Sequence, residues 1–567
     1  MSTPCLPHED PEAAQRESSL LAKREQYVYD PGVLPPFVLH HTLPDAEDSG
    51  GGLFAGFSSA VGMSVNVVAV KLAGLLDPFD ELQDFEDLFK TFETPAVVKH
   101  WRTDAMFAEQ RVAGVECRVL RAAPGLPQTL PVNFQISADE FAAAAGMSLE
   151  HAAAEGRLFI ADYAMLDGIA TGATGSRPKF LYAPIALFCW LDEPGSLDMS
   201  HDTPRRGRLA PVVIQLDQRR SAGNLYTAAD QPGWCMAKIA VQAADYTWNL
   251  LGHHLAICQF GMEAFAMATA RQLAEVHPLA VLLRPHLRHV LAQNQQLRRH
   301  FLNPGGYIER LFAPTREGAR EVMARSFERW DFKTWALPRD LEARGVSDPE
   351  RLPHYPYRDD GLLLWEAIAQ FVGEYLALFY TTDADLLADP ELHAWFTELT
   401  DPARGNVPGL PAWPLSCAAL GEIVTTILFT SGPDHSALNY RQWEYATHIP
   451  NLPMALHGAV PPCMPGRAHE RGASGDRAML DLLPPRGQAL AQIEVVQRMT
   501  AEQPDRFGLY GADSDPLLFA SDRIQEVVTA FQERLACIEG EVLERNTRRS
   551  FPYLGMLPSR LANSASV

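Results

Sequence analysis

The sequence has few cysteines, and no two of them are closely spaced. Eight are scattered over 567 residues, and none belongs to a CxxC motif. Disulfide frameworks and cysteine-based zinc sites need paired or regularly spaced cysteines, so neither is predicted. The first residues, MSTPCLPHEDPEAAQRESS, also lack the basic segment and apolar run of a signal peptide. We therefore expect a cytoplasmic protein with reduced thiols.

Positive charge is also scarce. The chain has 48 Lys and Arg against 70 Asp and Glu, a formal net charge of -22. Nucleic-acid binding requires a basic surface, so no nucleic-acid partner is expected. The composition likewise gives no support for docking on anionic lipid headgroups, which would need a local basic patch. Membrane contact is therefore expected to be transient at most.

No segment has the apolar length of a membrane span. The most apolar stretch is Ile239–Met262. It still contains the polar residues Asp245, Asn249, His253, His254 and Gln259. A helix facing lipid does not tolerate so many polar side chains, which indicates burial inside a protein instead.

The composition is that of a globular protein, with 47% hydrophobic and 21% charged residues. Residues 1–100 hold proline-rich turns, the Gly50–Gly52 run and an apolar patch at Leu53–Leu76, and we expect an arm with early helices. Residues 101–567 form the main body, where apolar runs such as Phe180–Leu191 predict a small β portion. Helical periodicity dominates in the blocks Trp234–Val276, Arg284–Phe301, Leu362–Tyr380, Ser416–Trp443 and Asp522–Asn546.

Two of these helical blocks are almost free of charge. Asp245 is the only formal charge between Lys238 and Glu263, and Glu422 is the only one between Arg404 and Asp434. A helix that is apolar all round belongs in the middle of a large protein. Polar side chains on such helices need hydrogen-bond partners or a metal. The sequence therefore predicts a mainly α fold with two central buried helices that present polar groups inward.

The second of these blocks ends in two metal-binding residue types. His435 and Asn439 are four residues apart, which places both on one face of a helix, one turn apart. Two such nitrogen and oxygen donors can bind one divalent ion. Alone the pair is a weak signal, because similar pairs commonly cap or bridge helices.

Longer motifs make the pattern specific. The first block combines W-x-x-A-K, a histidine with a partner five residues on, E-x-F, R-x-L, H-P and L-L-x-P-H. The second has H-x-x-x-N-x-x-Q-x-x-Y followed by P-N-x-P, and the chain ends in NSASV. The residues that carry these motifs are Trp234, Ala237, Lys238, Asp245, His254, Glu263, Phe265, Arg271, Leu273, His277, Pro278, Leu282, Leu283, Pro285, His286, His435, Asn439, Gln442, Tyr445, Pro450, Asn451 and Pro453.

In this order and spacing, the motifs over residues 100 to 567 resemble those of the lipoxygenase family. The resemblance implies the lipoxygenase catalytic-domain fold, in a short form without the β-sandwich lipid-binding domain that precedes it in many eukaryotic members. It also implies one non-haem iron, with manganese as the alternative. The implied metal ligands are His254, the position of Gln259, His435, Asn439 and the terminal carboxylate of Val567. Imidazole, amide and carboxylate donors together suit a redox-active first-row metal.

The implied activity is that of a dioxygenase. In the family, a metal-bound hydroxide abstracts hydrogen from an unsaturated fatty acid or lipid, and dioxygen then adds to give a hydroperoxide, so no side-chain base is required. The implied partners are a polyunsaturated lipid and dioxygen. The resemblance places Phe301 and Ile308 along the substrate channel, where ordinary core packing is the alternative.

Three positions depart from the family pattern. Gln259 replaces the second histidine, and a five-residue spacing from His254 shares a face on a π-turn but not on an α-helix. On a regular α-helix, Cys258 would lie one turn from His254 instead. Leu297 stands where the family has Ala or Gly beside the oxygen pocket, with core packing as the alternative. Leu250 replaces a Gln that the family links to the position of Gln442.

These departures leave three functional hypotheses. The first is ordinary lipoxygenase dioxygenation. The second is a divergent enzyme that performs another oxidation or a hydroperoxide isomerisation, because Gln259 alters the metal and Leu297 restricts oxygen. The third is a metal-free lipid-binding protein on the same scaffold.

Overall fold

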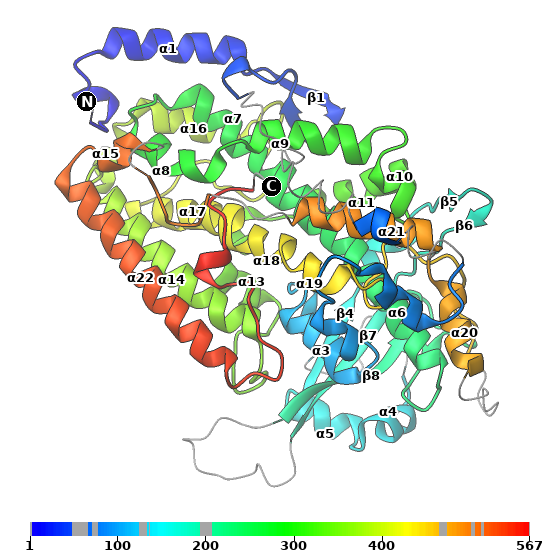
Figure 1. Ribbon diagram of the computed structural model, residues 1–567. Coiled ribbons are helices and arrows are strands. Elements are labelled where there is room, and N and C mark those ends of the chain that lie inside the picture. Colours follow the sequence, from blue (N-terminus) through cyan, green and yellow to red (C-terminus); the bar gives the residue numbers. More distant parts are fainter. Residues whose placement is uncertain are drawn as a thin grey trace.

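The computed structural model describes residues 3–47, 66–70, 78–123, 133–134, 136–192, 207–463, 473–500, 505–511 and 515–565. The Gly50–Gly52 run lies outside these residues, as does the apolar patch Leu53–Leu76 apart from residues 66–70. In the described part of the chain, helices make up most of the regular structure (Figure 1). The predicted mainly α fold is therefore confirmed.

The N-terminal part begins with one long helix and a hairpin. α1 (Ala13–Gln26) packs against α7 (Met262–Gln272), and Arg16 forms a buried ion pair of 2.6 Å with Glu391. The short 3-10 helix η1 (Pro7–Glu9) precedes α1. Later helices before residue 160 include α3 (Asp104–Ala113), α4 (Ala138–Ala145) and α5 (Leu149–Ala154), with the short 3-10 helices η2 (Asp45–Glu47), η3 (Leu82–Leu88) and η4 (Ala96–Lys99).

The β portion is a five-stranded antiparallel sheet in the order β3-β4-β7-β8-β9, with two small hairpins apart from it. Leu158 and Ile160 of β4 face a small core against α4 and α5, whereas Phe159 and Ala161 face the main core. This alternation follows the two-residue period of a strand. The strands are β1 (Tyr29–Leu34), β2 (Phe37–His40), β3 (Leu120–Ala122), β4 (Leu158–Asp162), β5 (Ala173–Thr174), β6 (Arg177–Pro178), β7 (Ile185–Asp192), β8 (Gly207–Gln215) and β9 (Leu225–Tyr226).

Two long continuous helices run through the interior, as predicted. The first joins α6 (Gly233–Thr247), the π-helix η6 (Trp248–Gly261) and α7. The second joins α17 (Cys417–Phe429), the π-turn η8 (Thr430–Asp434) and α18 (His435–Asn439). Their polar residues are enclosed together with the apolar ones, which is why both segments lack charge.

The remaining helices surround this pair. In Figure 1, α22 lies beside α14, and α14 also contacts α17. These surrounding helices are α8 (Pro278–Leu287), α9 (Val290–Leu297), η7 (Arg298–Leu302), α10 (Tyr307–Leu311), α11 (Arg316–Arg329), α12 (Phe332–Trp335), α13 (Leu337–Ala343), α14 (Pro356–Leu376), α15 (Asp383–Leu387), α16 (Pro390–Thr400), α19 (Gln442–Ala446), α20 (Ala473–Leu482), α21 (Arg486–Met499) and α22 (Asp522–Asn546), with the short helices η5 (Ala164–Leu166), η9 (Pro516–Phe519) and η10 (Pro558–Arg560).

One predicted helical block is wrong in its continuity. Arg284–Phe301 is broken where Arg288 adopts an extended conformation (ψ 133°) and His289 a left-handed one (φ 63°). The apolar periodicity continues on both sides of this two-residue break, so the sequence pattern does not reveal it. The break separates α8 from α9, and both helices contact the interior helices.

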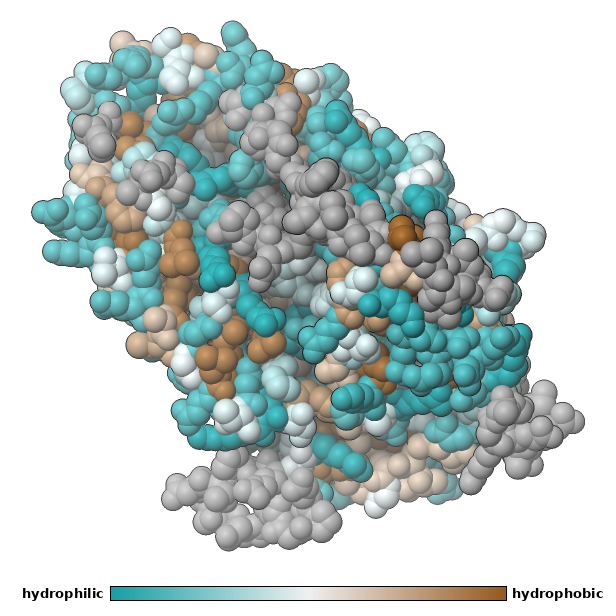
Figure 2. Space-filling model, viewed as in Figure 1, coloured by the Kyte–Doolittle hydropathy of each residue, from teal (hydrophilic) through white to brown (hydrophobic). Residues whose placement is uncertain are grey.

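The visible surface is mainly polar (Figure 2). Figure 2 shows a mainly hydrophilic face, with apolar residues gathered at the left over α14 and α22. Leu543 of α22, with 47% of its surface exposed, is one exposed apolar side chain on these two helices. In the described part of the chain, no helix combines the length and the apolar character that crossing a membrane requires.

Candidate metal centre

The π-helix η6 sets the geometry of the candidate centre. In a π-helix each turn is wider than in an α-helix, so residues five apart come onto one face. His254 and Gln259 are separated by this interval, and both are buried. The π-turn that the sequence required for these two residues to share a face is therefore present.

Three side chains converge from the two central helices. Nε2 of His254 on η6 lies 3.0 Å from Nε2 of His435 on α18. Nε2 of Gln259 lies 3.1 Å from the same His435 atom. An imidazole Nε2 carries either one proton or one lone pair, so His435 cannot satisfy both neighbours. A cation that accepts the lone pairs of both imidazoles would satisfy the two histidines.

Both histidines are held in the neutral form. Burial lowers the pKa of His435 to about 3 and, together with its histidine neighbours, lowers the pKa of His254 well below its ordinary value. Neutral imidazole is the form that binds metals. Nδ1 of each ring is buried and has no hydrogen-bond partner among the described residues. The donor set therefore fits a first-row divalent metal.

The amide of Gln259 is anchored to the C-terminal segment. Its Nε2 donates to the backbone carbonyl of Ala565 at 2.7 Å, while its Oε1 is buried without a partner. That oxygen is the atom of Gln259 that could ligate a metal. Val567, the fifth predicted ligand, lies outside the described residues, but the segment before it reaches the centre. In that segment, the carbonyl of Asn563 accepts a 3.0 Å hydrogen bond from Nδ1 of His286.

Asn439 lies one turn after His435 on α18, and its described hydrogen bonds go elsewhere. Its Nδ2 donates to the carbonyl of Met499 at 2.6 Å, and its Oδ1 accepts from Nε2 of Gln442 at 3.1 Å. An amide oxygen has two lone pairs, so Oδ1 retains one for a metal. Tyr246 completes this chain, because its hydroxyl donates to Oε1 of Gln442 at 2.8 Å.

Tyr246 is a site residue that the sequence analysis missed. Leu250 cannot form the link to Gln442 that the family pattern suggests, and Tyr246 makes that link from one turn earlier on the same helix. The sequence offered one signal for this role: a tyrosine within the nearly uncharged helical block, four residues before Leu250. Tyr246 is fully buried, so its hydroxyl needs a partner.

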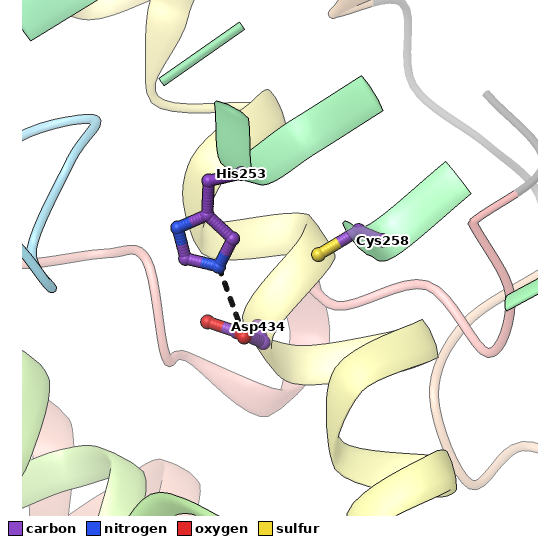
Figure 3. Close-up of side chains that lie close together, drawn as sticks. All are labelled: His253, Cys258 and Asp434. Atoms are coloured by element: carbon purple, nitrogen blue, oxygen red, sulfur yellow. Dashed lines mark hydrogen bonds and ion pairs between the residues drawn. The ribbon is translucent and has the colours of Figure 1, made fainter. Parts of the chain in front are cut away.

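A second cluster lies beside the histidine pair, on the adjacent face of η6. His253, Cys258 and Asp434 bring their nitrogen, sulfur and oxygen atoms within 4.8 Å of one another (Figure 3). Asp434 is also paired with Arg118 at 3.0 Å, and His253 with Glu116 at 3.1 Å. Cations already occupy the neighbourhood of each carboxylate, so this cluster is an ion-pair network. The alternative in which Cys258 joins His254 is therefore wrong, because Cys258 lies with His253.

The charges of this network stabilise one another. Burial by itself would lower the pKa of His253, but the carboxylates of Glu116 and Asp434 raise it well above its ordinary value. Burial by itself would raise the pKa of Asp434, but Arg118 and His253 lower it. Two anions and two cations thus balance in a buried position next to the histidine pair.

The predicted channel residues are all enclosed. Leu250, Leu297, Phe301 and Ile308 are each at most 2% exposed. Leu297 ends α9, which contacts the candidate centre through Asn294, whose Nδ2 donates to the carbonyl of Gln259 at 3.0 Å. Both the channel and the core-packing interpretations are compatible with this burial.

Comparison with known proteins gives one consistent result. The family model described as Lipoxygenase matches residues 69–553. The linoleate 9/13-lipoxygenase of Pseudomonas aeruginosa is 34% identical over 506 residues, which cover 86% of this chain and 70% of that protein. The human hydroperoxide isomerase ALOXE3 is 30% identical over 512 residues, covering 88% and 68%. A lipoxygenase crystal structure with arachidonate, 27% identical, has a TM-score of 0.87 over 100% of this chain and 84% of that one.

Proposed function

The chain belongs to the lipoxygenase family and is a dioxygenase of that family, and we propose that it converts a polyunsaturated fatty acid or lipid into a hydroperoxide with a single non-haem iron. The observation that carries the proposal for this chain is the 3.0 Å approach of two neutral, buried imidazole nitrogens, those of His254 and His435. Such a pair is the core of a first-row metal site.

Lipoxygenases generally contain non-haem iron, and we assign its ligands in this chain to the residues of the candidate centre. His254 and His435 supply nitrogen, Asn439 and Gln259 supply amide oxygens, and Val567 supplies the terminal carboxylate. Manganese is the alternative metal for such a donor set. When bound, the metal supplies one-electron redox chemistry and a coordination position for water.

The chain's own residues prepare the site in three ways. Burial keeps His254 and His435 neutral, so that their lone pairs are free to bind. The hydrogen bonds from Tyr246 to Gln442 and from Gln442 to Asn439 fix the amide oxygen of Asn439. The enclosed apolar side chains Leu250 and Leu297 exclude water from the region beside the ligands.

A second candidate function is isomerisation of a lipid hydroperoxide. The observation in its favour is Leu297, a bulky side chain at a position where the family has Ala or Gly, and 2% exposed. A relative of this chain carries the name hydroperoxide isomerase. In such a reaction the O–O bond breaks and the oxygen is transferred within the same molecule, so that no dioxygen is consumed.

Metal analysis combined with two substrates tests the proposal. We expect iron that co-purifies with the chain, and oxygen uptake with linoleate that equals the formation of conjugated diene. Consumption of a linoleate hydroperoxide without oxygen uptake would instead establish the isomerase. A metal-free protein that takes up no added iron would contradict both and indicate a lipid-binding protein.

Replacing Leu297 tests the oxygen-pocket role. Leu297→Ala removes bulk at the end of α9, and we expect faster oxygen uptake per bound iron with linoleate. The control is Leu291→Ala, which truncates another buried leucine on the same helix. Each truncation costs about 2–5 kcal/mol of stability. Equal oxygen uptake by the two variants would mean that Leu297 is ordinary core.

A further inference from the structure

A pocket of about 280 Å³ lies between three parts of the chain that are far apart in sequence. Residues of the β1–β2 hairpin, the α9–η7 segment and α11 line it. Its polar lining consists of Arg298, Arg299 and Arg320 together with His41, Gln295 and Asn303. Three guanidinium groups in one pocket are unexpected on a chain whose net charge is -22.

Two of these arginines have no direct partner among the described residues, although Glu317 interacts electrostatically with Arg320. Arg299 and Arg320 have no hydrogen bond or ion pair with any residue that the structure describes. The carboxylates near the pocket already have partners. Asp30 accepts from His41 at 2.7 Å, and Glu263 accepts from His40 at 2.7 Å.

The side chain of the third arginine, Arg298, is held in place by neighbouring residues. Nη2 of Arg298 donates to Nε2 of His40 at 2.8 Å, and His40 is held by Glu263, which also accepts from Asn294 at 2.8 Å. Nη1 of Arg298 is buried, has no hydrogen bond and lies 4.0 Å from Glu263. A guanidinium held in one orientation loses little entropy on binding, which favours affinity.

The lining of the pocket also includes the apolar side chains Val33, Leu34 and Leu302. A guanidinium cluster matches a carboxylate or phosphate, and an adjoining apolar wall matches a hydrocarbon chain. We propose that this pocket binds an oxyanion, carried on the charged end of an amphiphile or free in solution. This local basic site goes beyond the proposed oxidation, and it does not depend on the metal.

The test is binding of two probes to the full-length chain by titration calorimetry. Inorganic phosphate represents the free oxyanion, and short-chain phosphatidic acid below its micelle concentration represents the amphiphile. Short-chain diacylglycerol, which has the same acyl chains but no oxyanion, is the matched neutral lipid. Measuring the chain both with iron and after chelation separates this proposal from the proposed dioxygenase, since failure of the metal site would leave phosphate binding unchanged.

Two variants and one control test whether the oxyanion binds in this pocket. Arg299→Gln and Arg320→Gln each remove an exposed guanidinium, and we expect the affinity to fall about tenfold or more, as loss of a charge-assisted hydrogen bond implies. The control is Arg316→Gln on α11, because Arg316 is already paired with Glu317 at 2.9 Å and lies outside the pocket wall. Its affinity should match that of the unmodified chain.

Each outcome has a definite meaning. Binding of both probes that is lost in the two pocket variants supports an oxyanion site, and binding of phosphatidic acid alone supports it with the amphiphile as the source. No binding of either probe by the unmodified chain overturns the proposal. Equal loss in Arg316→Gln and Arg320→Gln also overturns it, because the interaction would then be unspecific attraction to surface charge.

Discussion

At the residue scale, Gln259 is the position that most affects the metal. It stands on the π-helix where the family has a histidine, and an amide oxygen is a weaker donor to a first-row metal than an imidazole. We predict that Gln259→His raises the iron content per chain toward one, as measured by elemental analysis after loading with ferrous iron. His254→Ala is the negative control, because it removes an imidazole ligand and should abolish iron binding. Unchanged iron in Gln259→His would contradict the assigned ligand register.

Tyr246 gives a second prediction at this scale. Tyr246→Phe leaves Oε1 of Gln442 buried without its donor, so unfolding should require about 1–2 kcal/mol less free energy. The variant should also release iron faster, because Gln442 orients Asn439.

The matched control for Tyr246 is Tyr375→Phe. Tyr375 is equally buried, and its hydroxyl donates at 3.0 Å to the carbonyl of Pro278 in α8. Both variants should lose similar stability in denaturant titrations, but only Tyr246→Phe should accelerate the transfer of iron to a chelator. Equal iron release from the two variants would show that Tyr246 is purely structural.

At the element scale, the π-helix η6 is what makes the centre possible. It puts His254 and Gln259 on one face, and His253 and Cys258 on the neighbouring one. Its position depends on close packing against α11, where the hydroxyl of Ser326 donates to the carbonyl of Gly252. Gly252 itself leaves room for the indole of Trp248.

Gly252→Ala therefore tests how tightly η6 is packed. A Cβ at this position would lie 2.6 Å from Cε3 of Trp248, so the ring or the helix has to shift. We expect a loss of about 1–3 kcal/mol of stability, accompanied by lower iron content. Gly421→Ala on α17 is the control. Nothing lies within 4 Å of its new Cβ, and alanine should stabilise that helix by up to about 1 kcal/mol. If Gly421→Ala lost as much stability as Gly252→Ala, the contact of residue 252 with Trp248 would be unimportant.

The arginine pocket also belongs to this scale. Arg298 lies on η7 and His40 on β2. Glu263 lies on α7, and Asn294 lies on α9. Nδ2 of Asn294 also donates to the carbonyl of Gln259, and this hydrogen bond connects the network to η6. Three secondary-structure elements are thus locked to the ligand-bearing helix by side chains that are themselves buried or half-buried.

At the scale of the whole molecule, buried carboxylates connect distant segments and make stability depend on pH. Asp389 begins α16 and accepts from His277 at 2.9 Å and from Tyr380 at 2.6 Å. Burial by itself would raise the pKa of Asp389, but the hydrogen bonds from His277, Tyr380 and the backbone of Leu392 lower it. Its contribution to stability is therefore present above the ordinary Asp pKa of about 3.9 and lost as the pH falls through the lower folded-state value.

Asp389→Asn tests this contribution. At pH 7 the variant should be about 1–3 kcal/mol less stable than the unmodified chain. The difference should shrink as the pH falls below about 4, because Asp389 takes up a proton first in the unfolded state and then, at lower pH, in the folded state. Denaturant titrations at several pH values measure it, with the exposed Asp522→Asn on α22 as the control. A difference that stays constant from pH 7 to pH 3 would contradict the assignment.

Much of this molecule was determined by the sequence alone. The absence of charge in two long blocks predicted two buried helices, and helical spacing placed His435 and Asn439 together. The motif order indicated the family, which the comparisons establish. These features depend on residue periodicity and spacing along one segment, so a linear pattern is sufficient to reveal them.

The tertiary structure decided what depends on contacts between segments. It separated His253 and Cys258 from His254, broke the predicted helix at Arg288, and brought Tyr246 to Gln442. It also gathered three arginines from η7 and α11 into one pocket on an acidic chain. Such pairings join residues up to hundreds of positions apart and are chosen by packing and by the need to satisfy buried polar groups, which local sequence patterns do not encode.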